Sequence, residues 1–170
     1  MKKQSGLVII DMQEGIFKLK QPVHHERILI ENMNKLIDWA KNNKVKVFYS
    51  QHENTTFLKY GSPDWEIIKD LQINNDAIIV YKKQSSIFTE TELYTELKTE
   101  RISKIYVAGL ISNGCIKDSC LDALNKDFEV VLIKDAHSTF YKNAEKVICQ
   151  INNEMENAEV VLQTTEGLIK

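Results

Sequence analysis

A cysteine with the surroundings of a nucleophile lies in the stretch from Val107 to Leu124. An apolar strand is expected over residues 105–108, a glycine-containing turn follows, and Cys115 then opens a segment with the apolar spacing of an amphipathic helix. A thiol in the first turn of a helix lies near the positive end of the helix dipole and near unpaired N–H groups, which favour the thiolate. Such a turn can also present backbone amides to an oxyanion. The alternative is a buried structural cysteine.

Two charged residues follow other predicted strands. Asp11 comes directly after the apolar run 7–10, and Lys82 comes directly after the apolar run 77–81. Because ligands of open parallel sheets bind at the carboxyl ends of the strands, we expect both residues to lie near Cys115. The ammonium would stabilise a thiolate, and the carboxylate could accept its proton and later return it to a leaving group. Taken singly, Asp11 could cap a loop and Lys82 could be a solvated surface lysine.

The elements that must position these residues are strands and helices that alternate along the chain. Apolar runs predict strands, and segments with a helical apolar period predict helices between them. The strands are expected at 7–10, 45–49, 77–81, 104–108, 128–133 and 159–162, and the helices at 26–43, 92–99, after Cys115 and at 142–153, with a closing turn at 164–168. This order predicts an α/β class, Rossmann-like doubly wound parallel sheet in a single domain, residues 1–170. Thr91 is expected to cap the helix at 92–99, with Tyr94 and Leu97 facing inward.

Composition excludes several function classes. The 170 residues are 43% hydrophobic with a formal net charge of −2, so no electrostatic footprint for nucleic acid or an anionic membrane is expected. The longest early apolar run, residues 7–10, is too short for a signal segment or a membrane span, so we expect a cytoplasmic protein. Three cysteines do not form a disulfide framework. Neither GxGxxG nor GxxxxGK[ST] occurs, which removes the commonest nucleotide sites of such a fold.

Several short motifs occur in order along nearly the whole chain. They are Leu7-Val-Ile-Ile-Asp11-Met-Gln13 with Phe17, Lys82 with Ser86, Phe88 and Thr91, Gly109-Leu-Ile-Ser-Asn-Gly-Cys115, and Asp135-Ala-His-Ser-Thr139. In these motifs the sequence resembles the isochorismatase-like cysteine hydrolases, the superfamily that contains nicotinamidases and N-carbamoylsarcosine amidase. The segments 49–53 and 61–66 resemble one branch of members without an assigned substrate. Single motifs are weak, but four in register are specific.

The resemblance implies a three-layer α/β/α fold with six parallel strands, usually as a homodimer or larger homo-oligomer. It implies that Asp11, Lys82 and Cys115 form a catalytic triad, and that the register selects Lys82 rather than its neighbour. It also implies a non-proline cis peptide between Leu110 and Ile111, with the backbone amides of Ile111 and Cys115 as the oxyanion hole. The implied course is attack of the thiolate on an amide carbonyl, loss of ammonia or an amine, and hydrolysis of the thioester.

The sequence departs from the nicotinamidases at their metal site. Ser50 stands where that site has an aspartate, His52 is kept, and residues 54–58 contain no further histidine. One histidine without that carboxylate makes a poor metal site, so we expect no metal, no cofactor and a hydrogen-bonding role for His52 in a loop. Nicotinamide is then not the expected substrate. Isochorismate cleavage needs no thiol, so Cys115 favours an amidase for a small-molecule amide.

The lining of a substrate pocket is predicted from apolar residues near the motifs. Such pockets are mostly apolar with a few convergent polar groups. The candidates are Phe17, Trp65, Phe88 and Ile116. Trp65 follows a Gly-Ser-Pro turn, and it could equally anchor that loop to the core.

Two other function classes remain open from the sequence. Cys115 could act with Cys120 as a redox pair, although residues five apart on one helix do not share a face. The chain could also be a catalytically silent, oligomeric member of the fold. Intact Asp11, Lys82 and Cys115 favour the hydrolase over both.

Overall fold

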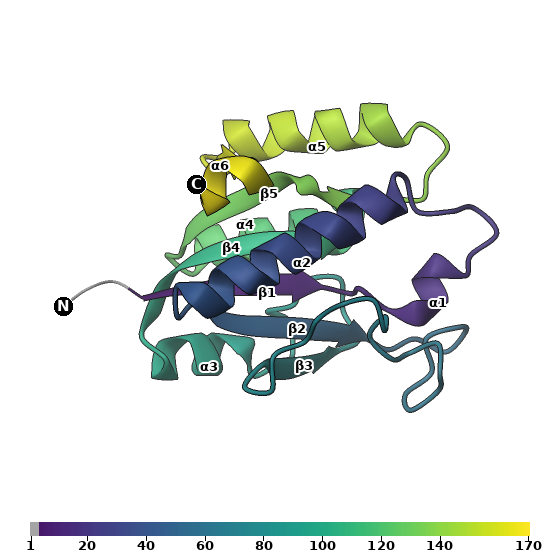
Figure 1. Cartoon of the computed structure of the whole chain (residues 1–170), viewed down its shortest axis with the longest axis horizontal. Helices are drawn as coiled ribbons and strands as arrows, with labels where there is room; N and C mark the ends of the chain where they lie inside the picture. The colour runs from purple at the N-terminus through teal and green to yellow at the C-terminus, as the bar shows by residue number, and fades with distance from the viewer. Residues whose placement is uncertain (1–3) are drawn as a thin grey trace.

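A computed structural model describes residues 4–170 of the chain, which form one six-stranded sheet flanked by helices (Figure 1). The strands are β1 (Gln4–Ile10), β2 (Lys46–His52), β3 (Ile78–Lys82), β4 (Ile102–Leu110), β5 (Glu129–Ser138) and β6 (Val161–Gln163). The helices are α1 (Glu14–Phe17), α2 (Glu26–Asn42), α3 (Leu93–Thr99), α4 (Lys117–Asn125), α5 (Ala144–Asn157) and α6 (Thr165–Ile169), with a π-helical turn, η1 (Ser112–Ile116), before α4. The alternation of strands and helices predicted from the apolar pattern is confirmed.

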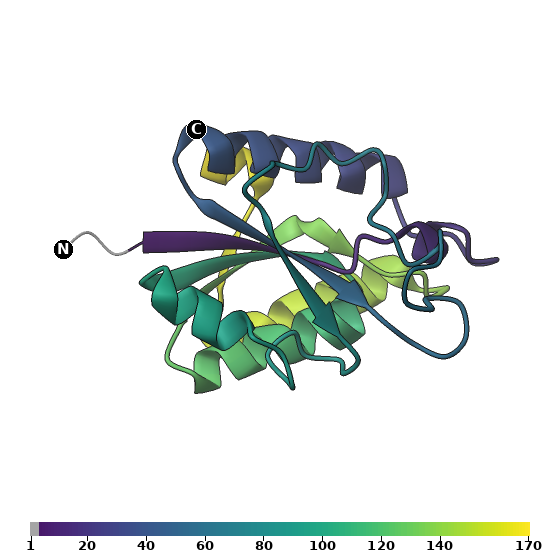
Figure 2. The same ribbon diagram turned by 90° about the horizontal axis from the view of Figure 1, so that it is seen from below.

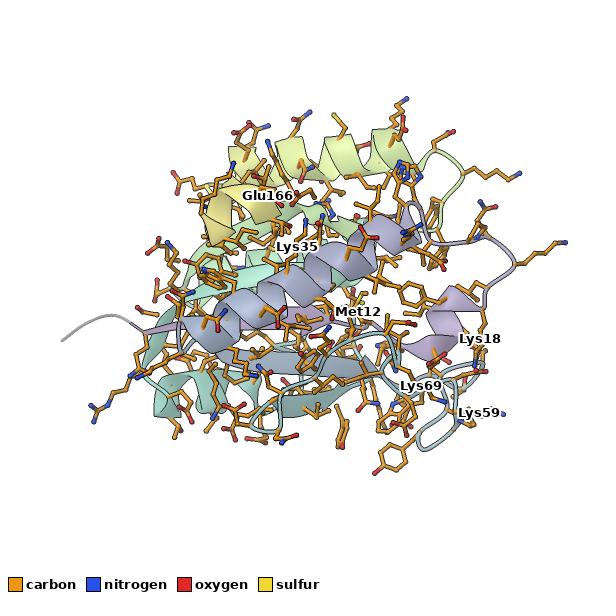
Figure 3. The ribbon with its side chains drawn as sticks, in the orientation of Figure 1. Met12, Lys18, Lys35, Lys59, Lys69 and Glu166 are labelled. Carbon is orange, nitrogen blue, oxygen red and sulfur yellow. The ribbon has the colours of Figure 1, made fainter. Side chains whose placement is uncertain are left out.

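The helices form a layer on each face of the sheet. Seen along the layers, α2 and α6 cover one face, and α3, α4 and α5 cover the other (Figure 2). Lys35 of α2 and Glu166 of α6 point toward one another and form an ion pair of 3.0 Å (Figure 3). The predicted three-layer α/β/α arrangement with a fully parallel sheet is therefore confirmed.

The continuous apolar run of β1 is explained by its central place. Leu7 and Ile9 belong to the core beneath α2, whereas Val8 and Ile10 belong to the core on the opposite face. All four side chains are buried, because successive side chains of a strand point to opposite faces and both faces are covered by helices.

The strand order β3-β2-β1-β4-β5-β6 reverses direction at β1. The chain proceeds from β1 outward through β2 and β3, and then crosses to β4 on the other side of β1. The carboxyl ends of β1 and β4 therefore flank a topological switch point, the position where α/β sheets of this kind bind ligands. The fold places the end of β1, residue 10, beside the end of β4, where Ile10 pairs with Gly109.

Gly109 permits the close approach of β4 to β1 at this point. Its φ is +122°, and a Cβ built on it would lie 2.2 Å from the carbonyl oxygen of Ile10. The pairing of β4 with β5 also shifts register between Val107 and Gly109. A glycine is required here because no side chain fits against the end of β1.

Some local expectations are corrected. The Asp135–Thr139 motif does not follow its strand, because β5 continues to Ser138 beyond the register shift. Tyr94 is 41% exposed, since Leu93 and Leu97, one turn apart, take the buried face of α3. Thr91 is not the N-cap residue of α3, which is Glu92, although the Thr91 hydroxyl still accepts the N–H of Leu93 at 3.3 Å. Within residues 4–170 no helix is long and apolar enough to cross a membrane.

Candidate active site

Asp11, Lys82 and Cys115 meet at the carboxyl end of the sheet. Asp11 follows β1 with a positive φ of 50°, Lys82 is the last residue of β3, and Cys115 lies in η1 after β4. Cys115 was expected in the first turn of an α-helix, but α4 begins only at Lys117. The reason is Gly114, whose φ of −139° and ψ of −108° interrupt helical geometry immediately before the cysteine.

The Lys82 ammonium is the centre of the site. Its Nζ lies 2.9 Å from Oδ2 of Asp11 and 3.2 Å from Sγ of Cys115. It also donates to the carbonyl oxygens of Gln84 (3.0 Å) and Ser85 (3.2 Å), and its side chain is fully buried. A buried ammonium is stable only when paired and hydrogen-bonded, and these contacts satisfy that requirement.

The surroundings of Lys82 and Cys115 shift the pKa of each side chain. Burial opposes the charge of Lys82, but Asp11 and Cys115 outweigh it, so the pKa of Lys82 is raised. For Cys115, burial and then the Asp11 charge raise the thiol pKa to about 11, against the opposing effect of Lys82. The helix start and Lys82 were expected to favour the thiolate, whereas burial and Asp11 favour the thiol. These effects favour a thiol at Cys115 beside an Asp11–Lys82 ion pair, because one anion already neutralises the ammonium.

Ser50 is a member of the site that the sequence did not reveal. Its hydroxyl donates to Oδ1 of Asp11 at 2.5 Å, and its oxygen accepts the backbone N–H of Asp11 at 3.0 Å. Both residues are buried. Ser50, which stands where the nicotinamidase metal site has an aspartate, thus supplies a hydroxyl that orients the Asp11 carboxylate. The signal for it was its position directly after the predicted strand 45–49, which matches the position of Asp11 after the predicted strand 7–10.

His52 also contacts the triad. It is the last residue of β2 rather than a loop residue, and its Nδ1 lies 3.2 Å from Nζ of Lys82. Burial, and then the Lys82 charge, lower the pKa of His52. The imidazole is therefore neutral near pH 7, with Nδ1 as the acceptor and the proton on Nε2. The expected hydrogen-bonding role is present, and its partner is Lys82.

The turn that carries Cys115 is braced by the Asp135–Thr139 motif. The peptide between Leu110 and Ile111 is cis, and the Ile111 carbonyl oxygen accepts the amides of Gly114 (3.1 Å) and Ile116 (3.2 Å). The Ser112 hydroxyl lies 2.8 Å from Nδ1 of His137. His137 is buried and its Nε2 lies 2.9 Å from Oδ1 of Asn152 in α5. β5 and α5 thereby hold the turn that carries Cys115.

The four residues proposed to line a pocket differ in how far their side chains are buried. Phe17, at the end of α1, is partly buried against the core beneath α2. Trp65 is 5% exposed and packs its ring against Tyr81 at 5.2 Å between centroids. Phe88 is 6% exposed, and Ile116 is fully buried in the opposite core. The loops around α1, with Lys18, Lys59 and Lys69, extend beyond the strand ends on the side of Met12 (Figure 3).

The chain is similar to known proteins over most of its length. The isochorismatase domain model matches residues 5–166. The chain is 26% identical over 154 residues to nicotinamidase 3 of Arabidopsis thaliana, covering 81% of this chain and 75% of that protein. It is 28% identical over 100 residues to a ureidoacrylate amidohydrolase of Agrobacterium fabrum, covering 58% of this chain and 44% of that protein.

Solved structures show the same fold. A cysteine hydrolase from Pseudomonas syringae superposes with a TM-score of 0.91 at 22% identity, covering 98% of this chain and 91% of that one. A zinc complex of pyrazinamidase from Pyrococcus horikoshii superposes with a TM-score of 0.84 at 20% identity, covering 95% and 99%. At such identities the likeness concerns architecture alone.

Proposed function

This chain belongs to the isochorismatase family, and we propose that it is a cysteine hydrolase that cleaves a carbon–nitrogen bond of a small amide. The observation that carries the proposal is the contact of one buried ammonium, that of Lys82, with both Asp11 and Cys115. Relatives described as a nicotinamidase and a ureidoacrylate amidohydrolase support this bond class. Ser50 at the position of the metal-site aspartate argues against nicotinamide itself.

The first step is a proton transfer coupled to attack. Because Cys115 rests as a thiol, its proton passes to Asp11 as Sγ approaches the carbonyl carbon. The C–S bond forms, and the carbonyl π electrons move to oxygen. Lys82 stabilises the transient thiolate, and the amides of Ile111 and Cys115 are the proposed donors to the oxyanion.

The second half returns the proton and frees the enzyme. Asp11 protonates the leaving nitrogen, the C–N bond breaks, and ammonia or an amine departs, leaving a thioester on Cys115. Asp11, again a carboxylate, then takes a proton from water while the hydroxyl attacks the thioester carbon. Collapse of this second intermediate breaks the C–S bond, and Cys115 regains its proton as the acid product leaves.

The substrate is held by the loops at the carboxyl end of the sheet. In this proposal Phe17, which keeps exposed surface, contacts the substrate directly. Trp65, Phe88 and Ile116 form the packed wall behind it. We further propose a homodimer or larger homo-oligomer, because Tyr60 and Tyr81, whose ring centroids lie 6.0 Å apart, both leave more than half of their surface exposed.

The test is a screen of primary amides, carbamoyl compounds and ureides for ammonia release. The wild type is compared with Cys115→Ala and with Cys120→Ala. Cys120 is fully buried, and burial raises its thiol pKa to about 12, so it is unsuited to a resolving role. We expect turnover by the wild type and Cys120→Ala, and none by Cys115→Ala. Turnover that survives in Cys115→Ala would exclude the thioester route, and loss in a folded Cys120→Ala would favour the redox alternative.

A further inference from the structure

We propose that this chain carries a divalent transition-metal site of the zinc class, bound by His24, His25 and Glu145, outside the catalytic site. The three side chains come from the turn before α2 and from the first turn of α5. One ligand atom from each lies within 4.8 Å of the other two. Two imidazoles and a carboxylate are a common zinc ligand set when a fourth position stays open to water.

The separations are close to those needed for coordination. Nε2 of His24 lies 4.0 Å from Oε1 of Glu145, and the rings of His24 and His25 lie 3.8 Å apart between centroids. Ligand atoms about 2.0–2.2 Å from zinc are roughly 3.3–3.5 Å apart in a tetrahedral arrangement. His25 and Glu145 are both exposed, so their side chains have room to rotate toward this spacing.

The backbone holds the histidines in place. The amide of His24 donates to the carbonyl oxygen of Thr139 at 2.9 Å, and the Ser138 hydroxyl donates to the carbonyl oxygen of His24 at 2.7 Å. His25 is the N-cap residue of α2, with a left-handed φ of 50° that turns its side chain beside that of its neighbour. Both imidazoles are thus presented from a fixed turn toward α5, so less ordering is needed on binding.

The site opens on a cavity of about 630 Å³ between α2, β5 and α5. This space gives room for a water molecule or a small anion on a fourth coordination position. His137 also lines the cavity, but both of its ring nitrogens are occupied by Ser112 and Asn152. It is therefore not a ligand, and His24 and His25 supply the imidazoles.

Glu156 provides a matched control for Glu145. Both glutamates lie on α5, and both line the cavity, but Glu156 is outside the three-residue cluster. Removal of either charge changes the electrostatic potential of the cavity in the same sense. A difference between their neutral variants therefore reports coordination rather than general attraction of a cation.

The experiment measures zinc binding by competition with a chromophoric chelator, in Cys115→Ala protein so that the catalytic thiol cannot take up metal. We expect one zinc per chain, and affinity at least roughly tenfold weaker in Glu145→Gln and in His25→Asn, with Glu156→Gln within about twofold. Cobalt should give the absorption of a tetrahedral N/O site, without a thiolate band from Cys149, which also lines the cavity. Binding below stoichiometry, or equal losses in Glu145→Gln and Glu156→Gln, would overturn the site.

Discussion

The Ser50 hydroxyl and the Asp11 carboxylate form a two-way contact: Ser50 donates to Oδ1 of Asp11, and its oxygen accepts the Asp11 backbone N–H. The contact joins the carboxyl ends of β1 and β2. Asp11 therefore has one carboxylate oxygen held by Ser50 and the other held by Lys82 at 2.9 Å. The orientation of the proposed proton acceptor depends on a residue that itself takes no part in bond making.

Replacement of Ser50 by alanine should slow turnover without abolishing it. A hydrogen bond to a charged group contributes about 1.5–3 kcal/mol, so we expect kcat to fall roughly tenfold to a hundredfold. The measurement is steady-state ammonia release on whichever amide the screen identifies. Ser103→Ala is the control, because the Ser103 hydroxyl is buried without a hydrogen-bond partner among the described residues. Unchanged kcat in Ser50→Ala would show that Asp11 is positioned without it.

Alkylation of Cys115 should follow a thiol with a raised pKa. Since burial and Asp11 raise that pKa to about 11, the iodoacetamide rate should keep increasing above pH 9 instead of reaching a plateau near neutrality. Asp11→Asn removes an anion that raises the pKa, so its profile should move to lower pH. Mass spectrometry of the peptide that contains Cys115 separates its signal from the exposed Cys149. A plateau near pH 7 in the wild type would contradict the thiol resting state.

Loss of the Lys82 charge should destabilise the fold as well as stop catalysis. Lys82→Met leaves Asp11 buried without its ion-pair partner, which costs about 3–5 kcal/mol in the free energy of unfolding. Urea denaturation measures this cost. Adding Asp11→Asn should restore part of the stability while activity stays absent. Lys83→Met is the control, because its side chain is 71% exposed and its loss should cost less than about 1 kcal/mol. Equal effects at the two lysines would reject the assignment of Lys82.

The two glycines with positive φ should respond differently to alanine. Gly109→Ala places a methyl group 2.2 Å from the Ile10 carbonyl oxygen, so the strand ends must separate. We expect a loss of well over 3 kcal/mol or no soluble protein. Gly61 has a φ of +73° but nothing within 4 Å of the added methyl, so Gly61→Ala should cost only about 1–2 kcal/mol. The midpoints of urea denaturation compare them, and similar values would show that β4 can move away from β1.

The sequence was sufficient for the fold and for the meeting of the triad. Apolar runs identify buried strands, and Asp11, Lys82 and Cys115 each come at or just after a strand end, so a parallel sheet must bring them to one edge. The protonation of Cys115 was not accessible in this way, because it depends on burial and on the balance between the charges of Asp11 and Lys82. The role of Ser50 was hidden for a similar reason, since a serine at a strand end has many possible partners.

Smaller errors have a common physical origin. Periodicity does not show where a strand stops when a register shift lets it continue, as in β5 through Ser138. It also cannot show which of two adjacent apolar residues faces inward, as with Leu93 and Tyr94. Both depend on contacts with neighbouring elements, which a single segment does not contain.

The sheet order places the proposed catalytic lysine on an edge strand. β3 stands at the edge, paired with β2 alone, and a long connection of residues 53–77 precedes it. Edge elements open locally at a lower free energy than the centre of a domain. Detachment of β3 would withdraw the ammonium from Asp11 and Cys115 while the strands that carry them stay paired. We therefore expect heat to inactivate this protein by detachment of β3 from β2, at temperatures where the rest of the molecule is still folded.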